Sequence, residues 1–204
     1  MPETERMLLR RPNWPDIDDV VALNADAEVM QFHGDGQPRT AAHVLSVEMP
    51  RLMSDVKRSD DLGHWVARDR STGEFLGWFT LVPVDSAPVR TVVLDYRLRR
   101  EAWGKGYGVE GTRRLVEMAR AAEVETIVAM TMDSDLSGHQ VMEGAGLQQV
   151  AASVGDATPV GAFGPGKRDF RLDLSTGAVP LEAGVTDPDW EPGSDLTTLG
   201  SADH

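Results

Sequence analysis

The chain has 204 residues, 41% of them hydrophobic, and a formal net charge of −13 at pH 7. This is enough apolar material for one well-buried domain with little left for a second, and the absence of cysteine excludes disulfides, thiolate metal sites and a cysteine nucleophile. The acidity argues against a nucleic-acid partner, which needs a basic surface, and favours a cationic or amine-bearing partner. No apolar run approaches about 18 residues and the N-terminus is unlike a secretory signal, so we expect a cytoplasmic protein with no membrane partner.

The first half of the chain predicts a strand, two helices and a β-hairpin. In chain order these elements are expected at residues 6–12, 16–30, 40–56, 63–69 and 74–84. Pro15 suits the first turn of the first helix, and Thr40 is a candidate N-cap of the second. Gly73, between the two hairpin strands, can supply the positive φ of a tight turn.

The second half predicts strands that alternate with helices. Strands are expected at residues 90–98, 125–132, 147–154 and 167–174, and helices at residues 108–122 and 135–146. Together with the first half, these elements predict a mixed α/β (α+β) domain over residues 1–174. Residues 175–204 carry six carboxylates and no Lys or Arg, so we expect a flexible acidic tail, with a docking segment around Trp190 as the alternative.

Glycines crowd the start of the helix expected at residues 108–122. Gly106, Gly108 and Gly111 match the dinucleotide fingerprint G-x-G-x-x-G literally, but that motif directly follows a strand and opens a doubly wound sheet, which does not fit this chain. A P-loop does not fit either, because no Lys-Ser or Lys-Thr follows the glycines. What fits is a pyrophosphate against the backbone N–H groups of a helix N-terminus, as suits coenzyme A; the alternative is a tight turn without a ligand.

Four stretches of the chain, in this order, resemble the GNAT acyltransferases and, among them, the ribosomal-protein N-acetyltransferase (Rim-type) branch. The stretches are TERMLLRRP, ADAEVMQFHGDGQPRTAAHV, DYRLRREAWGKGYGVEG and VMEGAGLQQV. The resemblance covers residues 4–174 and implies a GNAT-like, mostly antiparallel sheet of about seven strands with about four helices. It also implies acetyl-CoA as the cofactor and direct transfer of acetyl to a primary amine, on a small molecule or a protein N-terminus. Homodimers are common in that branch, although no residue pattern here indicates one.

By this resemblance, the acyl-CoA site combines the glycine segment with the strand before it, which should separate from its neighbour. The residues expected to bind the cofactor are Tyr96, Arg97, Leu98, Trp103, Gly104, Lys105, Gly106, Tyr107, Gly108, Arg113 and Asp135. Within this set, the amides of residues 103–108 would hold the pyrophosphate, and Lys105 with Arg113 or Arg114 would add positive charge. A backbone N–H of Leu94 or Asp95 would polarise the thioester carbonyl if the strand bulges there.

The sequence departs from the family where acid and base are expected. Val93 stands where many relatives have Glu, Gly138 where a Ser is common, and Met142 where other GNAT branches have a Tyr. These substitutions also make a catalytically weak acyl-CoA-binding or regulatory module a second hypothesis for the function. No metal is expected in either case.

Three residues are therefore the main catalytic candidates, and a fourth is a weaker one. Asp95 is the candidate base, directly or through water, with a structural role as the alternative. Asp135 would contact the pantetheine arm in the place of a family Asn, and Ser137 is a weaker candidate acid. His139, one turn beyond Asp135, has a suitable unperturbed pKa, although its helix spacing also fits a surface position.

The acceptor pocket is expected between the first helices and the hairpin. Phe32, His33, Trp65 and Trp78 are candidate walls, with a place in the core as the alternative for the two tryptophans. Acidic side chains nearby, Glu28 or Asp35, could attract an ammonium group.

Overall fold

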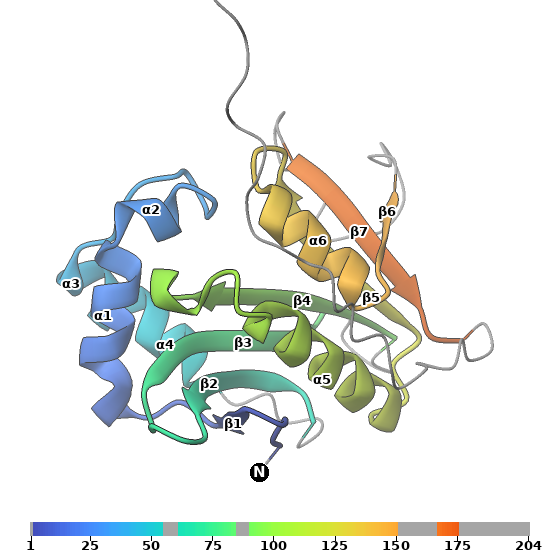
Figure 1. The fold of residues 1–204 in the computed structure, drawn as a ribbon, viewed down its shortest axis with the longest axis horizontal. Helices are drawn as coiled ribbons and strands as arrows, with labels where there is room; N and C mark the ends of the chain where they lie inside the picture. Colours follow the sequence, from blue (N-terminus) through green and yellow to red (C-terminus); the bar gives the residue numbers. More distant parts are fainter. Residues whose placement is uncertain (1, 55–60, 85–89, 151–166, 176–204) are drawn as a thin grey trace, which may run out of the picture.

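The computed structural model describes residues 2–54, 61–84, 90–150 and 167–175. The centre of the molecule is one seven-stranded sheet in the order β1-β2-β3-β4-β5-β7-β6 (Figure 1). The strands are β1 (Met7–Arg10), β2 (Gly63–Asp69), β3 (Phe75–Pro83), β4 (Thr91–Leu98), β5 (Thr126–Met132), β6 (Gln148–Val150) and β7 (Lys167–Asp173). All neighbouring strands are antiparallel except β4 and β5. The predicted mixed, mostly antiparallel seven-stranded sheet is therefore confirmed, while residues 151–154 of the strand expected at 147–154 lie outside the described residues.

Helices cover both faces of the sheet (Figure 1). They are α1 (Ile17–Ala25), α2 (Ala27–Met30), α3 (Ala41–His43), α4 (Met49–Leu52), α5 (Tyr107–Ala121) and α6 (Leu136–Gly144). Leu23 of α1 shares a buried cluster with Trp78 of β3, whereas Leu115 of α5 shares a second cluster with Phe79. Because neighbouring residues of a strand point to opposite faces, α1 and α5 lie on opposite sides of the sheet.

Both helices predicted in the first half are interrupted. The backbone of Asp26 is extended, at φ −75° and ψ 114°, and its side chain accepts from the N–H of Glu28, so α2 begins anew after α1. The second helix contains a π-helical turn, η2 (Val44–Glu48), between α3 and α4. Pro50 follows this turn and has no N–H for the regular helical bond to the residue four positions earlier, which accounts for the widened turn. Two short 3-10 turns, η1 (Trp14–Asp16) and η3 (Arg100–Ala102), complete the set.

The sheet opens in its middle. β4 and β5 pair only over Thr91–Val93 and Thr126–Val128. Beyond these residues β4 stays paired with β3 as far as Leu98, and β5 stays paired with β7 as far as Met132. The predicted separation of the strand before the glycines from its neighbour is therefore present.

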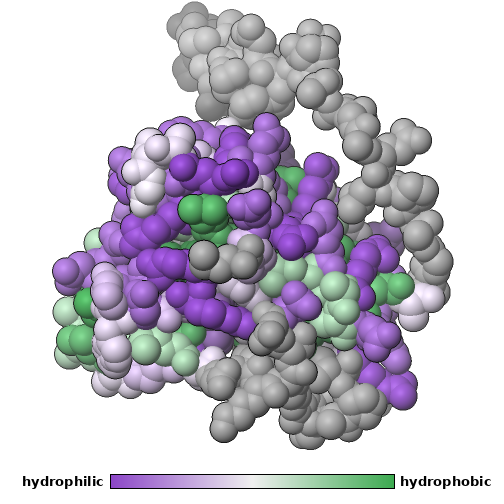
Figure 2. All heavy atoms as spheres, turned by 90° about the horizontal axis from the view of Figure 1, so that it is seen from below, coloured by the Kyte–Doolittle hydropathy of each residue, from purple (hydrophilic) through white to green (hydrophobic). Residues whose placement is uncertain are grey.

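The outer surface carries no broad apolar face in the view of Figure 2, where hydrophilic residues surround scattered apolar ones. The most exposed large apolar side chains belong to separate elements, among them Leu8, Trp14 and Leu136. No helix in the described part of the chain is long and apolar enough to cross a membrane.

Candidate active site

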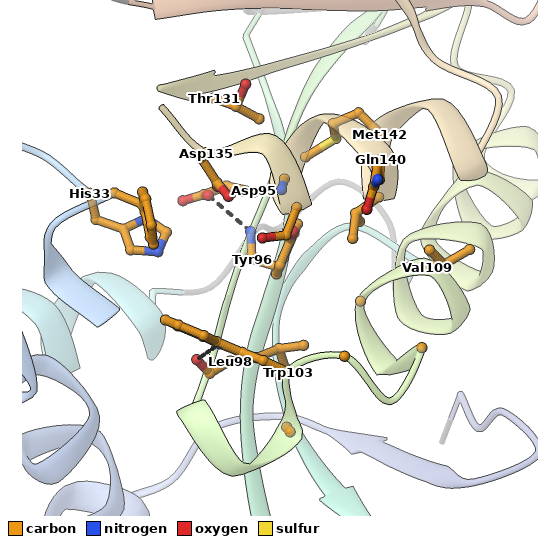
Figure 3. A pocket seen from close by; sticks show the side chains of 18 of the residues that line it. His33, Asp95, Tyr96, Leu98, Trp103, Val109, Thr131, Asp135, Gln140 and Met142 are labelled. Atoms are coloured by element: carbon orange, nitrogen blue, oxygen red, sulfur yellow. Dashed lines mark hydrogen bonds between the residues drawn. The ribbon is translucent and has the colours of Figure 1, made fainter. Parts of the chain in front are cut away.

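A cavity of about 480 Å³ lies where β4 and β5 separate (Figure 3). Asp95, Tyr96 and Leu98 line it from β4, and Trp103 lines it from the segment before α5. The other lining residues are Phe32, His33, Ala102, Gly104, Gly106, Gly108, Val109, Met130, Thr131, Asp135, Ser137, Gly138, Gln140, Val141 and Met142. The cavity thus joins the open strand edge, the glycine segment, the first turns of α6 and the segment after α2.

The direction of the main-chain groups along β4 follows from two hydrogen bonds at its start. The carbonyl of Arg90 accepts from Thr126 at 2.9 Å, on the β5 side, and the carbonyl of Thr91 accepts from Val84 at 2.9 Å, on the β3 side. Since successive residues of a strand direct their main-chain groups to opposite edges, the even-numbered residues of β4 face the side that β5 leaves. Beyond the last pair, Val93 with Val128, the edge of β4 next to the cavity therefore carries the main-chain groups of Tyr96 and Leu98.

This alternation corrects the predicted thioester-binding amides. β3 and β4 keep one continuous register from Pro83↔Val92 to Gly77↔Leu98, so β4 has no bulge against β3. The N–H of Asp95 consequently faces β3 and not the cavity, whereas the N–H of Leu94 faces β5 where Val93 is still paired with Val128. Neither predicted N–H donor therefore lines the cavity, and the first N–H of β4 beyond the pairing with β5 is that of Tyr96.

The carboxylate of Asp95 lies at the same edge. Its Oδ1 accepts a hydrogen bond from the backbone N–H of Tyr96 at 2.9 Å, drawn as a dashed line in Figure 3. Burial raises the pKa of Asp95, and it outweighs the opposite effect of the nearby Arg97 and Arg51 guanidinium groups. A carboxylate with a raised pKa, lining a cavity, is a suitable proton acceptor.

Two further ring side chains of the cavity wall are held uncharged. Burial lowers the pKa of His33 to about 3, assisted by the positive charge of Arg97 and opposed by Glu48, so His33 is neutral at pH 7. Burial also raises the pKa of the Tyr96 hydroxyl, with further contributions from Asp135 and Asp95. The Tyr96 ring stacks on Phe79 with a centroid distance of 5.8 Å, which holds it in place.

The glycine segment forms a tight entry to α5. Gly104 and Gly106 have φ values of 68° and 79°, in the left-handed region that favours glycine, and a Cβ on Gly104 would meet nothing within 4 Å. The first N–H groups of a helix such as α5 have no partner within the helix, and they point out of its N-terminus. Backbone amides beside open space are a site of the right kind for the pyrophosphate of coenzyme A.

The contacts of Trp103 remove its backbone N–H from the set of amides, residues 103–108, that were predicted to hold the pyrophosphate. Its backbone N–H donates to the carbonyl of Arg100 at 2.9 Å and is not available to a ligand. Its indole Nε1 donates to the carbonyl of Leu98 at 2.9 Å, and its ring lies 6.2 Å from that of Phe32. Trp103 therefore forms one end of the cavity with Phe32, and the available amides begin at Gly104.

The glycine segment is held from outside by charged side chains. Arg6 donates to the carbonyl of Lys105 at 2.7 Å and to the Glu110 carboxylate at 2.6 Å. The Tyr107 hydroxyl donates to Asp69 at 2.6 Å. These bonds join the segment to β2 and to the residue just before β1, and they support its conformation from outside the cavity.

Several predicted cofactor residues lie away from the cavity wall. Arg97 is 7% exposed; its main-chain groups face β3, and its guanidinium donates to Asn24 and lies over the Trp78 ring at 5.0 Å. Arg97 therefore does not line the cavity, unlike its neighbours Tyr96 and Leu98. Lys105 and Tyr107 belong to the glycine segment but do not line the cavity.

The predicted basic residues of α5 lie along a second groove. Arg113 donates to the Gly144 carbonyl at 2.8 Å, and Arg114 pairs with Glu117 at 2.7 Å. Both line a polar groove that touches the cavity at Gly106 and Val109. Their predicted contact with phosphates is untested by this geometry and stays a prediction.

The first turn of α6 explains one departure from the family pattern. Asp135 is the N-cap of α6, and its Oδ1 accepts from the Gly138 N–H at 2.8 Å. A Cβ on Gly138 would lie 2.3 Å from Asp135 Oδ2, so a serine at 138 would require the capping carboxylate to shift. Asp135 lines the cavity, and contact with a pantetheine arm stays a prediction.

The proposed catalytic role of His139 does not fit its position. His139 does not line the cavity; its Nε2 donates to the Met132 carbonyl at 2.9 Å, and its ring packs against Phe170 at 5.7 Å. It is 7% exposed and so is not a surface residue either. Helical spacing in the sequence could not predict that His139 is buried, because its neighbour Phe170 belongs to β7, which is distant in the chain.

Of the predicted acceptor-pocket walls, Phe32 and His33 line the cavity. Trp65 and Trp78 are 1% and 0% exposed and belong to the core, as the alternative had it. The two acidic candidates are paired: Glu28 with Arg100 at 2.5 Å, and Asp35 with Arg39 at 3.0 Å.

Sequence reasoning missed two residues of the cavity wall on α6, Gln140 and Val141. Gln140 and Val141 lie three and four positions after Ser137, and this helical spacing places all three on one face. Helical periodicity counted from Ser137 could have identified them. Among the described residues, no group of three His, Cys, Asp or Glu side chains could hold a metal ion.

The separated strands, the glycine entry to α5 and the cavity between them define an acyl-CoA-dependent transferase fold. The chain belongs to the GNAT acetyltransferases, since residues 6–148 match the Acetyltransferase (GNAT) domain family. It is 32% identical over 135 residues to the FsC-acetyl coenzyme A-N(2)-transacetylase of Aspergillus fumigatus. That match covers 63% of this chain and 56% of the fungal protein, so the chain corresponds to little more than half of this relative.

Solved structures share the fold at low sequence identity. A GNAT-family acetyltransferase from Bacillus anthracis superposes with a TM-score of 0.66 at 14% identity, covering 84% of this chain and 96% of that one. The spermidine N-acetyltransferase of Vibrio cholerae, solved with CoA and spermine, has a TM-score of 0.63 at 13% identity, covering 83% and 96% of the two chains. These likenesses establish the fold, and membership of the Rim-type branch stays a prediction.

Proposed function

We propose that the protein is an N-acetyltransferase that transfers the acetyl group of acetyl-CoA to a primary amine in a direct ternary complex. The observation that carries the proposal is the cavity of about 480 Å³ at the separation of β4 and β5, bounded by the glycine entry to α5. An extended donor arm fits the open edge of β4, and its pyrophosphate fits the N–H groups of Gly104 through Gly108. Membership of the GNAT family supports this assignment.

The reaction requires three events, each of which needs a protein group. The ammonium of the acceptor loses a proton, the free amine attacks the thioester carbonyl, and the C–S bond breaks while the sulfur gains a proton. Asp95 is the proposed proton acceptor, directly or through a water molecule, because it lines the cavity and its pKa is raised. The open-edge N–H groups of β4 are the proposed donors to the carbonyl oxygen.

His33 is the proposed partner of the acceptor amine. Its imidazole lines the cavity and is neutral at pH 7, since its pKa is lowered to about 3. A neutral ring nitrogen can accept a hydrogen bond from an amine N–H and does not repel a cation. This supports an amine-bearing acceptor, which is also the substrate class named for the spermidine and aminoglycoside acetyltransferases that share the fold.

Thermal-shift titration tests the proposal, because a ligand that binds only the folded state raises the unfolding midpoint with its concentration. We expect acetyl-CoA and CoA to raise the midpoint and NADH to leave it unchanged. A screen of primary amines with detection of released thiol should then find an acceptor. No shift with acetyl-CoA would overturn the donor site, whereas a shift without turnover on any amine would favour the acyl-CoA-binding module.

The remaining predictions belong to the same proposal. We propose a transferase domain over residues 1–174, followed by an acidic tail over residues 175–204, most of which lies outside the described residues. A cytoplasmic location, a protein N-terminus as acceptor and a homodimer stay predictions.

A further inference from the structure

The backbone N–H of Tyr96 points to the open edge of β4 and already has an acceptor. The main-chain alternation along β4 places this N–H on the side that β5 leaves after Val93. The acceptor is the Oδ1 of the preceding residue, Asp95, at 2.9 Å. A strand-edge N–H inside a cavity is the kind of group that binds a ligand carbonyl, and here a carboxylate of the protein itself occupies it.

We propose that Asp95 is an internal cap on the acyl-donor site, holding the Tyr96 N–H in the free protein and leaving it when the thioester carbonyl takes that position. The proposal rests on the proposed function, since it assumes a thioester donor. It adds a place for the reacting carbonyl and a step, the displacement of Asp95, that precedes transfer.

The displacement follows from charge and from the number of donors. One N–H cannot make a good bond to a carboxylate and to a carbonyl oxygen together. The carbonyl oxygen also gains negative charge as the amine attacks, and a carboxylate beside it would oppose this in a poorly solvated cavity. The cap therefore has to move before the N–H can assist the reaction.

The surroundings offer the displaced carboxylate a favourable direction. Asp95 and Arg97 are two residues apart in β4, so their side chains lie on the same face of the sheet, the face covered by α1 and α4. Arg97 of β4 and Arg51 of α4 act on the Asp95 charge favourably, and Glu48 of η2 acts against it. His33 lies in the same cavity wall and is neutral. Rotation of the Asp95 side chain away from Tyr96 thus moves it within a region where positive charge predominates and toward the proposed acceptor side.

This arrangement couples the two substrates. While the donor is absent, the Asp95 carboxylate is engaged at Tyr96 and is a poorer proton acceptor for an amine. Once the donor carbonyl displaces it, the carboxylate is released next to the place where the amine must lose its proton. We expect productive binding in the order donor first, acceptor second.

Calorimetric titration of two variants tests the cap. Asp95→Asn and Asp95→Ala both remove the charge, but only Asn keeps an oxygen that can accept from the Tyr96 N–H. We expect Asp95→Ala to bind acetyl-CoA about three- to tenfold more tightly than Asp95→Asn, the effect of one competing hydrogen bond. Each variant serves as the control for the other with respect to charge.

The second ligand in the titration is CoA, which has no thioester carbonyl. The advantage of Asp95→Ala over Asp95→Asn should vanish with CoA. Equal affinities of the two variants for acetyl-CoA, or an equal advantage with both ligands, would overturn the proposal. Failure of the wild type to bind either ligand would instead overturn the proposed function, so the two failures are distinguishable. Melting curves of both variants confirm that the proteins compared are folded.

Discussion

Gly111 of α5 lies against the ring of Phe79 in β3, so closely that a Cβ on Gly111 would sit 2.2 Å from Phe79 Cζ. The third glycine of the literal dinucleotide fingerprint is therefore required for helix–sheet packing and does not line the cavity. The three glycines of the fingerprint therefore have different roles, since Gly106 and Gly108 line the cavity and Gly111 does not. Gly104, which is outside the fingerprint, also lines the cavity.

We expect Gly111→Ala to destabilise the fold, because the added methyl group overpacks the contact with a fully buried ring. Overpacking of this kind costs typically about 1–3 kcal/mol in the free energy of unfolding. Denaturant unfolding followed by fluorescence measures it. Affinity for acetyl-CoA, measured well below the melting temperature, should stay near that of the wild type. An unchanged midpoint would show that the Phe79 ring yields without cost.

Gly106→Asp should weaken coenzyme binding by at least about tenfold. The change places a side chain and a negative charge at a left-handed position, φ 79°, at the N-terminus of α5, where an anionic ligand is proposed to lie. Isothermal titration with CoA measures it. Gly73→Asp is the matched control, because Gly73 has φ 75° in a turn with open space around it and carries the same strain. Equal loss in both variants would contradict the placement of the pyrophosphate.

Asp95→Asn should lower turnover by roughly 10²-fold, the usual contribution of a general base. Acetyl-CoA affinity should stay close to the wild-type value, because the amide oxygen can still accept from Tyr96. Steady-state rates with a saturating amine, together with a direct binding measurement, separate the two quantities. Full activity of the variant would remove Asp95 from proton transfer.

Because His64 is buried, we expect the protein to lose stability in mild acid. Its ring is 4% exposed, its Nδ1 lies 2.9 Å from Thr80 Oγ1, and burial together with Arg51 and Arg11 lowers its pKa from 6.5 to about 4. The unfolded state thus binds more protons between these values, so stability is complete above pH 6.5 and falls as the pH drops toward 4. The expected loss between pH 7.5 and pH 5 is about 2 kcal/mol from this group.

The pH dependence of His64 is checked by unfolding His64→Gln and wild type in parallel. The variant should lose less stability on going from pH 7.5 to pH 5. If the free energies of unfolding of His64→Gln and the wild type fell in parallel with pH, the buried His64 ring would not be the cause of the acid-induced loss of stability.

Much of the fold could be predicted from the sequence. Alternating and β-branched runs located the hairpin strands, β5 and β7, and apolar residues at helical spacing located α5 within one residue of its observed bounds. The first two helices were placed correctly but were expected to be continuous. Asp26 and Pro50 break them through local capping and a missing N–H, effects that periodicity does not register.

The candidate site could be predicted only in part. The glycine segment and the adjacent strand are contiguous in sequence, so their motif located them, and Tyr96, Leu98 and Gly106 do line the cavity. Arg97 and His139 were misplaced because which neighbour each side chain meets depends on elements distant in the chain, Asn24 for the first and Phe170 for the second.

The sequence by itself determined the fold class, a mixed α/β domain, because hydrophobic periodicity and glycine placement are local properties that specify strands, helices and an anion-binding helix entry. Only the tertiary structure decided how β4 meets its neighbours. The alternation of its main-chain groups has a period of two residues, so whether Asp95 or Tyr96 offers its N–H to the cavity depends on the register with β3 and on where β5 departs. That register turns the Tyr96 N–H toward the cavity, and because β5 has departed there, the acceptor of this N–H is the Asp95 carboxylate and not a neighbouring strand.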